Sequence, residues 1–411
     1  MTPTNFDYIL VGGGLQSGLI ALALKHYQSH AKILIVERGD RLGGNHTWSF
    51  HPKDVSATAN EWLNSVVEYK WPSYQVRLNR FKKEIELSYA SISSQHFSRA
   101  ILQSMEIGER GVVRTNTEVT QVRSNTITTV DGHSYTGRLV LDCRGPSRSG
   151  APLYSQSGYQ KFWGFEIGLK TDWPFNGPIV MDDNVDQLDG FRFIYSLPFE
   201  RRRVLVEDTR FSNESGIDRE ECLAQVRRYL TAIGVEDWSI VREEHGILPM
   251  PISSELLPGS CNSTPAISGG YAGGWFHAAT GYSFPLAIAF AETIARSTPE
   301  SAASEIEKLA GMHRGRSRFG RFLNRLLFRL VKPPARYQIF RRFYKVLSND
   351  SIARFYSHRF TWRDAFRIVV GWPPGGLQPA RFLGSFRKVR DRASSKRHSQ
   401  PTTNTLKEMG T

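Results

Sequence analysis

The sequence of 411 residues is poor in cysteine. Cys143, Cys222 and Cys261 are odd in number and far apart along the chain. This pattern fits neither a disulfide framework nor the close ligand spacing of a zinc site. We therefore expect reduced, structural thiols and no metal centre.

Long apolar runs are also missing. No stretch approaches the roughly 18 apolar residues of a membrane-spanning helix, and the best candidate, 285–295, is short and contains Glu292. The N-terminus lacks the basic, then apolar, then small-residue pattern of a secretory signal. These absences predict a protein that stays in the cytoplasm.

Acidic residues are scarce toward the C-terminal end. Between residues 313 and 397 there are 22 Lys and Arg but only three acidic residues, in a chain whose net charge is +14. The basic charge therefore belongs to the C-terminal region. Nucleic acid and an anionic bilayer are both candidate partners, because each presents dense negative charge.

Glycine, in contrast, is abundant in the N-terminal segment. A β-branched run, 8–11, stops at Gly12, Gly13 and Gly14, and from Leu15 onward apolar residues recur at helical spacing. A strand, a tight turn and a helix in this order let the backbone approach a pyrophosphate at the positive end of the helix. The pattern predicts the start of a Rossmann dinucleotide-binding fold.

A second predicted strand, 33–36, is followed by Glu37 and Arg38. In such folds a carboxylate at this position accepts hydrogen bonds from the ribose hydroxyls of an adenine dinucleotide. The third fingerprint position holds Ser17, with the glycine displaced to Gly18. These residues alone leave nicotinamide and flavin dinucleotides open.

Three later segments favour FAD. A second glycine pair, 43–44, precedes a polar and aromatic cluster around His46, which is either a binding loop or a packed connection. The apolar strand 138–142 ends in Asp142, with Gly145 close behind. The small-residue stretch 265–283 contains Gly281 and Tyr282 and leads into a helix, so it can offer free N–H groups to a flavin.

The length and the order of these segments predict two interleaved domains and an appendage. The expected divisions are an FAD-binding domain (1–75, 90–150 and 265–300), a β-rich substrate domain (76–89 and 151–264), a basic helical C-terminal region (301–392) and a disordered tail (393–411).

Within the basic region, residues 317–332 predict an amphipathic helix. Its apolar residues recur at helical spacing beside a separate stripe of arginines, and residues 336–347 repeat this character. A solvated basic face and a surface lying on anionic lipid are the alternatives, and we favour the lipid surface, formed by residues 317–347. We expect no nucleic-acid partner.

Five segments together resemble the bacterial lycopene β-cyclase family, and the resemblance extends over roughly residues 5–375. The segments are 11–22, 43–50 (with His-Thr-Trp-Ser-Phe), 182–197, 204–209 (with Glu-Asp-Thr) and 276–285. The resemblance implies an α/β flavoprotein of the glutathione-reductase-like class that converts lycopene through γ-carotene to β-carotene. It also implies reduced FAD as cofactor and NAD(P)H as reductant. The basic amphipathic segments, in turn, predict a peripheral position at the inner face of the cell membrane. We find no separate NAD(P)H fingerprint.

Cyclisation of this kind adds one proton and removes another without net oxidation, so it needs a strongly positioned acid and negative charge near a carbocation. Glu207 matches the acid–base glutamate of the family, and burial would keep it protonated near neutral pH. Asp208 is the second catalytic candidate, although on a regular strand it points to the other face and would orient or bind. His277 and Glu166 are secondary candidates. We expect His277 to pack or form hydrogen bonds more often than to act as a base. Glu166 lies on a predicted strand whose aromatic neighbours could line a tunnel for the polyene.

Two rival functions remain at this point. One is an FAD-dependent monooxygenase or desaturase acting on an isoprenoid. The other is a basic lipid- or nucleic-acid-binding module with a relic flavin fold, against which the intact glycine turns and Glu37 weigh.

Overall fold

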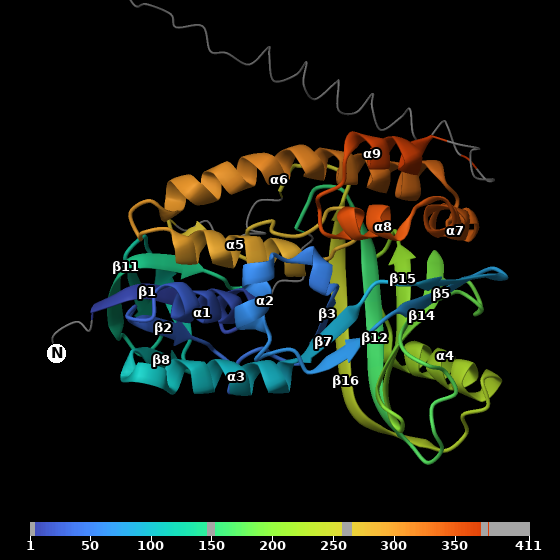
Figure 1. Cartoon of the computed structure of the whole chain (residues 1–411), viewed down its shortest axis with the longest axis horizontal. Helices are drawn as coiled ribbons and strands as arrows, with labels where there is room; N and C mark the ends of the chain where they lie inside the picture. The colour runs from blue at the N-terminus through green and yellow to red at the C-terminus, as the bar shows by residue number, and fades with distance from the viewer. Residues whose placement is uncertain (1–4, 146–152, 257–264, 371–376, 378–411) are drawn as a thin grey trace, which may run out of the picture.

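The structure is a computed structural model that describes residues 5–145, 153–256, 265–370 and 377. The predicted tail, Cys261 and the end of the predicted C-terminal region lie outside the described residues. The described helices and strands form two large sheets, a small third sheet and a set of C-terminal helices (Figure 1).

The first sheet has seven strands and carries the predicted Rossmann unit. Its strands are β1 (Asn5–Val11), β2 (Ile33–Val36), β8 (Gly111–Arg114), β9 (Val119–Val122), β10 (Thr126–Thr129), β11 (Ser134–Asp142) and β17 (Ile267–Ser268). The order is β8-β2-β1-β11-β10-β9, with β17 beside β11, and β8, β2, β1 and β11 run parallel. The parallel strands confirm the expected βαβ arrangement.

Three helices pack together over this sheet. They are α1 (Leu15–Tyr27), α3 (Ser94–Glu106) and α5 (Phe284–Arg296), and α1 contacts both others. Buried residues of α1, α3 and α5 share one apolar core with strands β1 and β2. Such a core holds the N-terminus of α1 firmly at the carboxyl edge of the parallel strands, where dinucleotides bind.

The second sheet also has seven strands and forms the other half of the molecule. Its strands in order are β16 (Trp238–Pro251), β12 (Ser157–Leu169), β15 (Arg203–Ser212), β14 (Phe191–Glu200), β13 (Ile179–Asp182), β5 (Tyr74–Leu78) and β6 (Phe81–Ile85). The helix α4 (Arg219–Ala232) packs against β12 and β15. Strands β5 and β6 form an antiparallel hairpin. Strand β16 was not predicted from the sequence.

A small three-stranded sheet consists of β3 (Thr47–Phe50), β7 (Tyr89–Ser93) and β4 (Tyr69–Trp71). The helix α2 (Ala57–Leu63) comes after β3 in the chain. In Figure 1 β3 and β7 lie between the first sheet and the second. The aromatic cluster after the second glycine pair is therefore a strand and not a loop.

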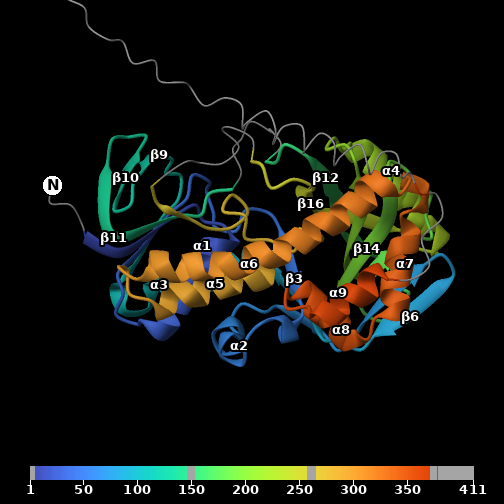
Figure 2. The same ribbon diagram turned by 90° about the horizontal axis from the view of Figure 1, so that it is seen from above.

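The C-terminal helices extend over both halves. They are α6 (Ala302–Arg325), a π-helical turn (Leu326–Leu330), α7 (Tyr337–Val346), α8 (Asn349–Tyr356) and α9 (Trp362–Val369). Figures 1 and 2 show α6 running from α5 across to the second sheet. Among the described residues, no helix has the length and apolarity to cross a membrane.

The prediction of an amphipathic helix over 317–332 is wrong in its bounds. Residues 317–325 end the longer helix α6 and residues 326–330 form the π-helical turn, and in this part of α6 the buried residues are Ser317, Gly320 and Asn324. The Asn324 side-chain amide donates hydrogen bonds to the carbonyl oxygens of Pro251 (3.0 Å) and Ala278 (2.6 Å). Small and polar residues let the helix lie close to its neighbours, which leaves most of the predicted apolar stripe half-buried at the edges.

The apolar side of α7 packs inward. Phe340 stacks on Phe191, with ring centroids 4.5 Å apart, and Tyr344 is fully buried in the core of the second sheet. Those residues therefore complete the protein interior. In α7 and α9, the large apolar side chains that stay open to solvent are Val346, Trp362, Phe366 and Val369.

Candidate functional site

A single cavity of about 1440 Å³ joins the two halves of the molecule. One end is lined by the glycine turn after β1 and by Glu37 and Arg38, and the other by aromatic residues of the second sheet. Sites for one drug-sized ligand have volumes of about 300–1,000 Å³. This cavity is large enough for a nucleotide cofactor and an extended apolar substrate side by side.

The glycine turn opens into the cavity. Gly12 has a positive φ of 96°, a conformation that side chains rarely adopt. A Cβ on Gly14 would meet no atom within 4 Å, so the approach to the N-terminus of α1 is clear. Gly12, Gly14 and Leu15 all line the cavity, as expected for a pyrophosphate site.

The residues after β2 complete this end. The Glu37 carboxylate accepts the N–H groups of Gly13 (2.5 Å) and Gly39 (2.7 Å), which fixes its position beside the turn. Arg38 and Gly145 also line the cavity. Asp142 does not, and its carboxylate is paired with the Arg144 guanidinium at 2.7 Å behind the wall.

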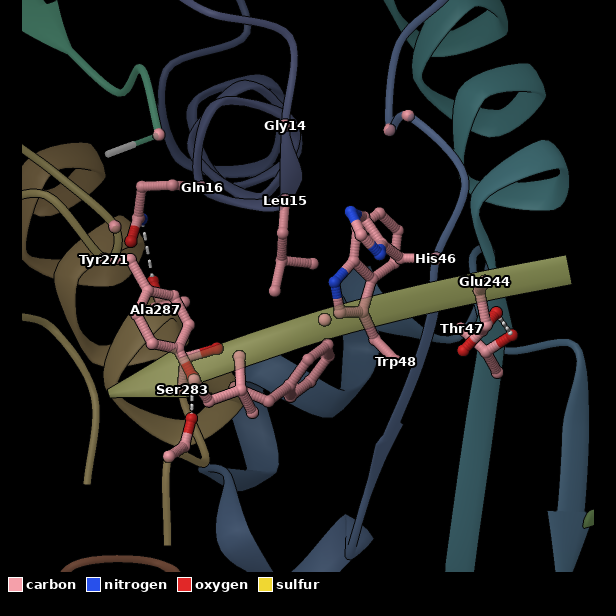
Figure 3. Close-up of a pocket in the computed structure, with 18 of the residues that line it drawn as sticks. Gly14, Leu15, Gln16, His46, Thr47, Trp48, Glu244, Tyr271, Ser283 and Ala287 are labelled. Carbon is pink, nitrogen blue, oxygen red and sulfur yellow. Dashed lines mark hydrogen bonds between the residues drawn. The ribbon is translucent and has the colours of Figure 1, made fainter. Parts of the chain in front are cut away.

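The middle of the cavity is formed by the loop before α5 and by the strand β3. Gly281 adopts a positive φ of 69° and Tyr282 donates its hydroxyl to Asp54 Oδ2 at 2.8 Å. Figure 3 shows Gln16, Tyr271 and Ser283 on one side and His46 and Trp48 on the other. Burial lowers the pKa of His46, so its imidazole is neutral near neutral pH.

The far end is aromatic. Side chains from β14, β15 and α7 line it, namely Phe193, Tyr195, Phe211 and Phe340. Tyr195 donates to the Ser49 hydroxyl at 3.0 Å, and the hydroxyls of Tyr195 and Tyr89 lie 3.2 Å apart. This end offers apolar surface and ring faces, which suit a hydrocarbon and a cation.

Glu207 lies at the junction of the two ends. It is 8% exposed and lines the cavity. Burial, and next the nearby Glu244, raise the pKa of Glu207 well above its usual range. This shift favours the protonated form of the carboxyl, which is the form that can donate a proton.

Asp208, the next residue, is on the opposite face of β15. It is fully buried and accepts from Arg192 Nε (2.8 Å) and Arg210 Nη2 (2.9 Å). It is not among the residues that line the cavity. These ion pairs hold β14 and β15 together from behind the site.

His277 and Glu166 also lie outside the cavity wall. The pKa of His277 is lowered to about 3, mainly by burial, so the ring is neutral and packed. Glu166 is 2% exposed and bridges Arg203 and Arg242. Both secondary candidates thus support residues of the site without reaching its interior.

Most of the chain matches a known protein family. The family model described as "Lycopene cyclase protein" matches residues 7–382. This match includes the glycine turn and Glu207. The chain belongs to the lycopene cyclase family.

Two relatives within the lycopene cyclase family are lycopene beta-cyclases from Pantoea ananas and Pseudescherichia vulneris. Each is 35% identical to this chain, and the alignments cover 90% and 91% of this chain and 95% and 96% of the relatives. A solved structure, the flavin-dependent brominase Bmp2, is 12% identical with a TM-score of 0.59 and covers 95% of this chain and 100% of that chain. This last likeness shows the fold alone.

The lycopene cyclase site also contains residues that we did not predict. Arg242 and Glu244 project from β16, and Thr47 from β3, and all three line the cavity. The Glu244 carboxylate accepts from the Thr47 hydroxyl (2.8 Å, dashed in Figure 3) and from Arg242 Nη1 (2.6 Å). The two adjacent acids Glu243 and Glu244 can be seen in the sequence. Because no strand was predicted there, the sequence did not indicate that Glu244 lies near Glu207.

Proposed function

We propose that this chain is a lycopene β-cyclase, an isomerase that converts the ψ-ends of lycopene into β-ionone rings, giving γ-carotene and then β-carotene. The observation that carries the proposal is the position of Glu207, a buried carboxyl at the junction of a dinucleotide-binding end and an aromatic end of one cavity. The family membership and the names of the two relatives support the same reaction.

The proposed cofactor is FAD, and the residues of the first sheet fit it. Gly12, Gly14 and Leu15 would take the pyrophosphate, Glu37 and Arg38 the adenosine ribose, and Gly281 and Tyr282 the flavin end. In its reduced form, supplied with electrons by NAD(P)H, FAD would place negative charge near a carbocation. The clear space beside Gly14 and the positive end of α1 are the features that support this assignment.

The protein residues would carry the proton chemistry. Glu207 would donate a proton to C2 of the end group, the C5–C6 double bond would attack the cation at C1, and a proton would leave C6. An alkene is a very weak base, so the donor must be held protonated in a dry site, and the burial and raised pKa of Glu207 suit that role. Asp208 would hold β15 in position through Arg192 and Arg210.

Lycopene dissolves in membranes, so we also propose that the protein binds peripherally to an anionic bilayer at the cytoplasmic face. The structure changes the expected contact. Phe340 and Tyr344 of α7 pack inward. Trp362 and Phe366 of α9, in contrast, are 74% and 59% exposed beside Arg363 and Arg367. Exposed aromatic residues flanked by arginines are suited to a lipid interface. The membrane-facing surface would therefore include α9 as well as residues 317–347.

The rival is an FAD-dependent monooxygenase or desaturase acting on an isoprenoid, a reaction class in which the product gains oxygen or loses hydrogen. Expression in lycopene-accumulating cells, followed by pigment analysis and mass spectrometry, separates the two. Cyclisation predicts ring-containing carotenoids of the same mass as lycopene. A product of altered mass would support the rival, and unchanged lycopene together with a purified protein that lacks FAD would reject both.

A further inference from the structure

Four neighbouring strands of the second sheet place one residue each in a single row across the sheet. The register pairs Tyr195 with Glu207, Glu207 with Gly164, and Gly164 with Glu244. Residues paired in this way have their side chains on the same face. Glu207 and Glu244 therefore point to the cavity side, with Gly164 between them.

Gly164 keeps the space between the two glutamates open. Strands two positions apart in a sheet are separated by roughly 9–10 Å, so the side chains of Glu207 and Glu244 must lean across the middle strand to meet. A Cβ on Gly164 would lie 2.8 Å from Glu207 Cγ and 3.3 Å from Glu207 Oε1. Glu207 thus occupies the space that any larger residue at 164 would need. The backbone at 164 is not left-handed, so steric room is what requires glycine here.

The two carboxyls hydrogen-bond to each other. A hydrogen bond between two carboxyl groups needs one proton on one of them. Glu244 Oε2 already accepts from the Thr47 hydroxyl and the Arg242 guanidinium, and these donors favour a negative charge on Glu244. The shared proton therefore belongs on Glu207.

The other polar groups around the pair agree with this assignment. Tyr195 and Tyr89 face Glu207 from β14 and β7, and burial raises the pKa of both phenols, so they stay neutral. His46 lies near Glu244 and is neutral because burial lowers its pKa. Arg242 is the cation closest to the pair, and it is held from behind by Glu166 at 2.9 Å.

We propose that Glu244 is the ionised partner that keeps Glu207 protonated, and that the missing side chain at Gly164 is what lets the two carboxyls share one proton. The proposal rests on the proposed cyclase function. In the reaction the Glu207 O–H bond breaks as the C2–H bond forms. The electron pair of the C5–C6 double bond makes the C1–C6 bond, and the C6 proton returns to the carboxyl pair. No electrons are gained or lost, and the pair ends with one proton, as it began.

The first test is the pH profile of the flavin-loaded enzyme with lycopene in liposomes. Activity requires protonated Glu207, so it falls as the pH rises through the apparent pKa of that group. Glu244→Gln removes the neighbouring negative charge, so ionisation of Glu207 becomes easier. The alkaline limb of the profile should move to lower pH by about one unit or more. Glu244→Asp keeps the charge and should keep the limb close to its original position.

A second readout does not depend on turnover. Infrared spectra should show a protonated carboxyl band that disappears in Glu207→Gln and titrates at lower pH in Glu244→Gln. The proposal is overturned if Glu244→Gln reduces only the rate. In that case neither the alkaline limb of the pH profile nor the titration of the carboxyl band shifts, and the role of Glu244 is structural. If the wild-type enzyme forms no rings, the proposed function fails, whereas the infrared titration still tests the pair.

The role of Gly164 has its own test and a matched control on the same strand. Gly164→Ala should displace Glu207 and reduce the rate of ring formation about tenfold or more, with flavin content unchanged. Gly168 lies on the same face of β12, and a Cβ there would make only ordinary contacts, 3.6 Å from Val241 Cγ2 and 3.7 Å from Ser239 Oγ. Gly168→Ala should keep nearly full activity. Equal activity in both variants would refute the spacing argument.

Discussion

Gly18 sets the distance between two helices of the cofactor-binding half. A Cβ at this position would lie only 2.2 Å from Cζ of Phe97 on α3. The third glycine of the Rossmann fingerprint normally allows close packing of the helix. The displaced glycine of this chain therefore retains the packing role, one position later, and it acts between α1 and α3.

Gly18→Ala should lower the free energy of unfolding by about 1–3 kcal/mol, because the extra methyl group has to displace the Phe97 ring. Urea unfolding of the flavin-loaded protein measures this. Gly315→Ala is the control, since Gly315 is exposed on α6 with no atom within 4 Å of its Cβ position. It should be neutral or stabilising by up to ~1 kcal/mol. Equal effects would mean that Gly18 is not a packing glycine.

Single residues differ in how far their roles could be predicted from sequence. Glu207 stands in a motif that resembles a known family, so its role could be proposed from the sequence alone. Glu244 could not, because its part in the site depends on strand pairing between residues some 80 positions apart in the chain, which local patterns do not specify. The role of Gly164 could not be predicted for the same reason. It depends on the two strands that pair with β12, which bring Glu207 and Glu244 to either side of Gly164.

Three histidines, of which His277 and His358 are buried and His313 is half-buried, connect separate elements beside the loop before α5. His277 belongs to the loop before α5, His313 to α6 and His358 to the turn after α8. His313 Nδ1 lies 3.2 Å from His358 Nε2, and the rings of His277 and His358 are 4.8 Å apart. Burial lowers the pKa of all three, to about 3 for His277 and about 2 for His358. The C-terminal helices are thus attached to the flavin loop through neutral imidazoles.

This cluster should make the attachment sensitive to acid. A folded-state pKa below the unfolded value of about 6.5 means that the unfolded chain binds protons first as the pH falls. The stabilisation is complete above pH 6.5 and is lost progressively toward pH 3, by about 2 kcal/mol at pH 5 for each of His277 and His358. His358 has a positive φ of 59°, which asparagine tolerates, so His358→Asn is the suitable variant.

Unfolding of wild type and His358→Asn in urea at several pH values measures this dependence. Between pH 6.5 and pH 4 the variant should lose less stability than the wild type. Parallel curves for the two proteins would show that His358 does not contribute to acid sensitivity.

Helices and strands with a clear periodicity were predictable, whereas β16 was not. The strand contains the polar run Arg242-Glu243-Glu244-His245 and two prolines, features that favour a loop. Its long pairing with β12 outweighs that local preference. The bounds of α6 were missed for a related reason. In its C-terminal part the buried residues are Ser317, Gly320 and Asn324, which are small or polar, and a search for apolar periodicity does not detect them.

The described part of the molecule combines two large sheets, a small third sheet, a cavity between the two halves and a layer of C-terminal helices that covers the second large sheet. The basic region was visible in the composition alone. The three-dimensional packing was needed to tell which of its apolar residues face the protein and which face outward. Both α7 and α9 combine aromatic residues with arginines, but Tyr344 of α7 is buried whereas Trp362 and Phe366 of α9 are exposed.

The outward side of this layer should bind anionic membranes. Replacing Trp362 and Phe366 by serine should weaken sedimentation with anionic liposomes severalfold, because it removes the apolar groups that would enter the interface. The matched control is Ile107→Ser. Ile107 is 72% exposed and directly follows α3. In Figure 1 the helix α3 lies on the side of the molecule away from α9.

In that experiment, high salt should weaken binding of the wild type, since the arginines act through screened charge. Binding that is equal in both variants and insensitive to salt would contradict the membrane surface.

The most direct measurement of the proton-donor role of Glu207 compares wild type and Glu207→Gln, both loaded with FAD and reduced, on lycopene in liposomes. Glutamine keeps the volume of the side chain but has no acidic proton. The wild type should form ring-containing carotenoids with the mass of lycopene, and Glu207→Gln should bind flavin equally and form none. Ring formation by Glu207→Gln at the wild-type rate, or a product of different mass from the wild type, would contradict the account.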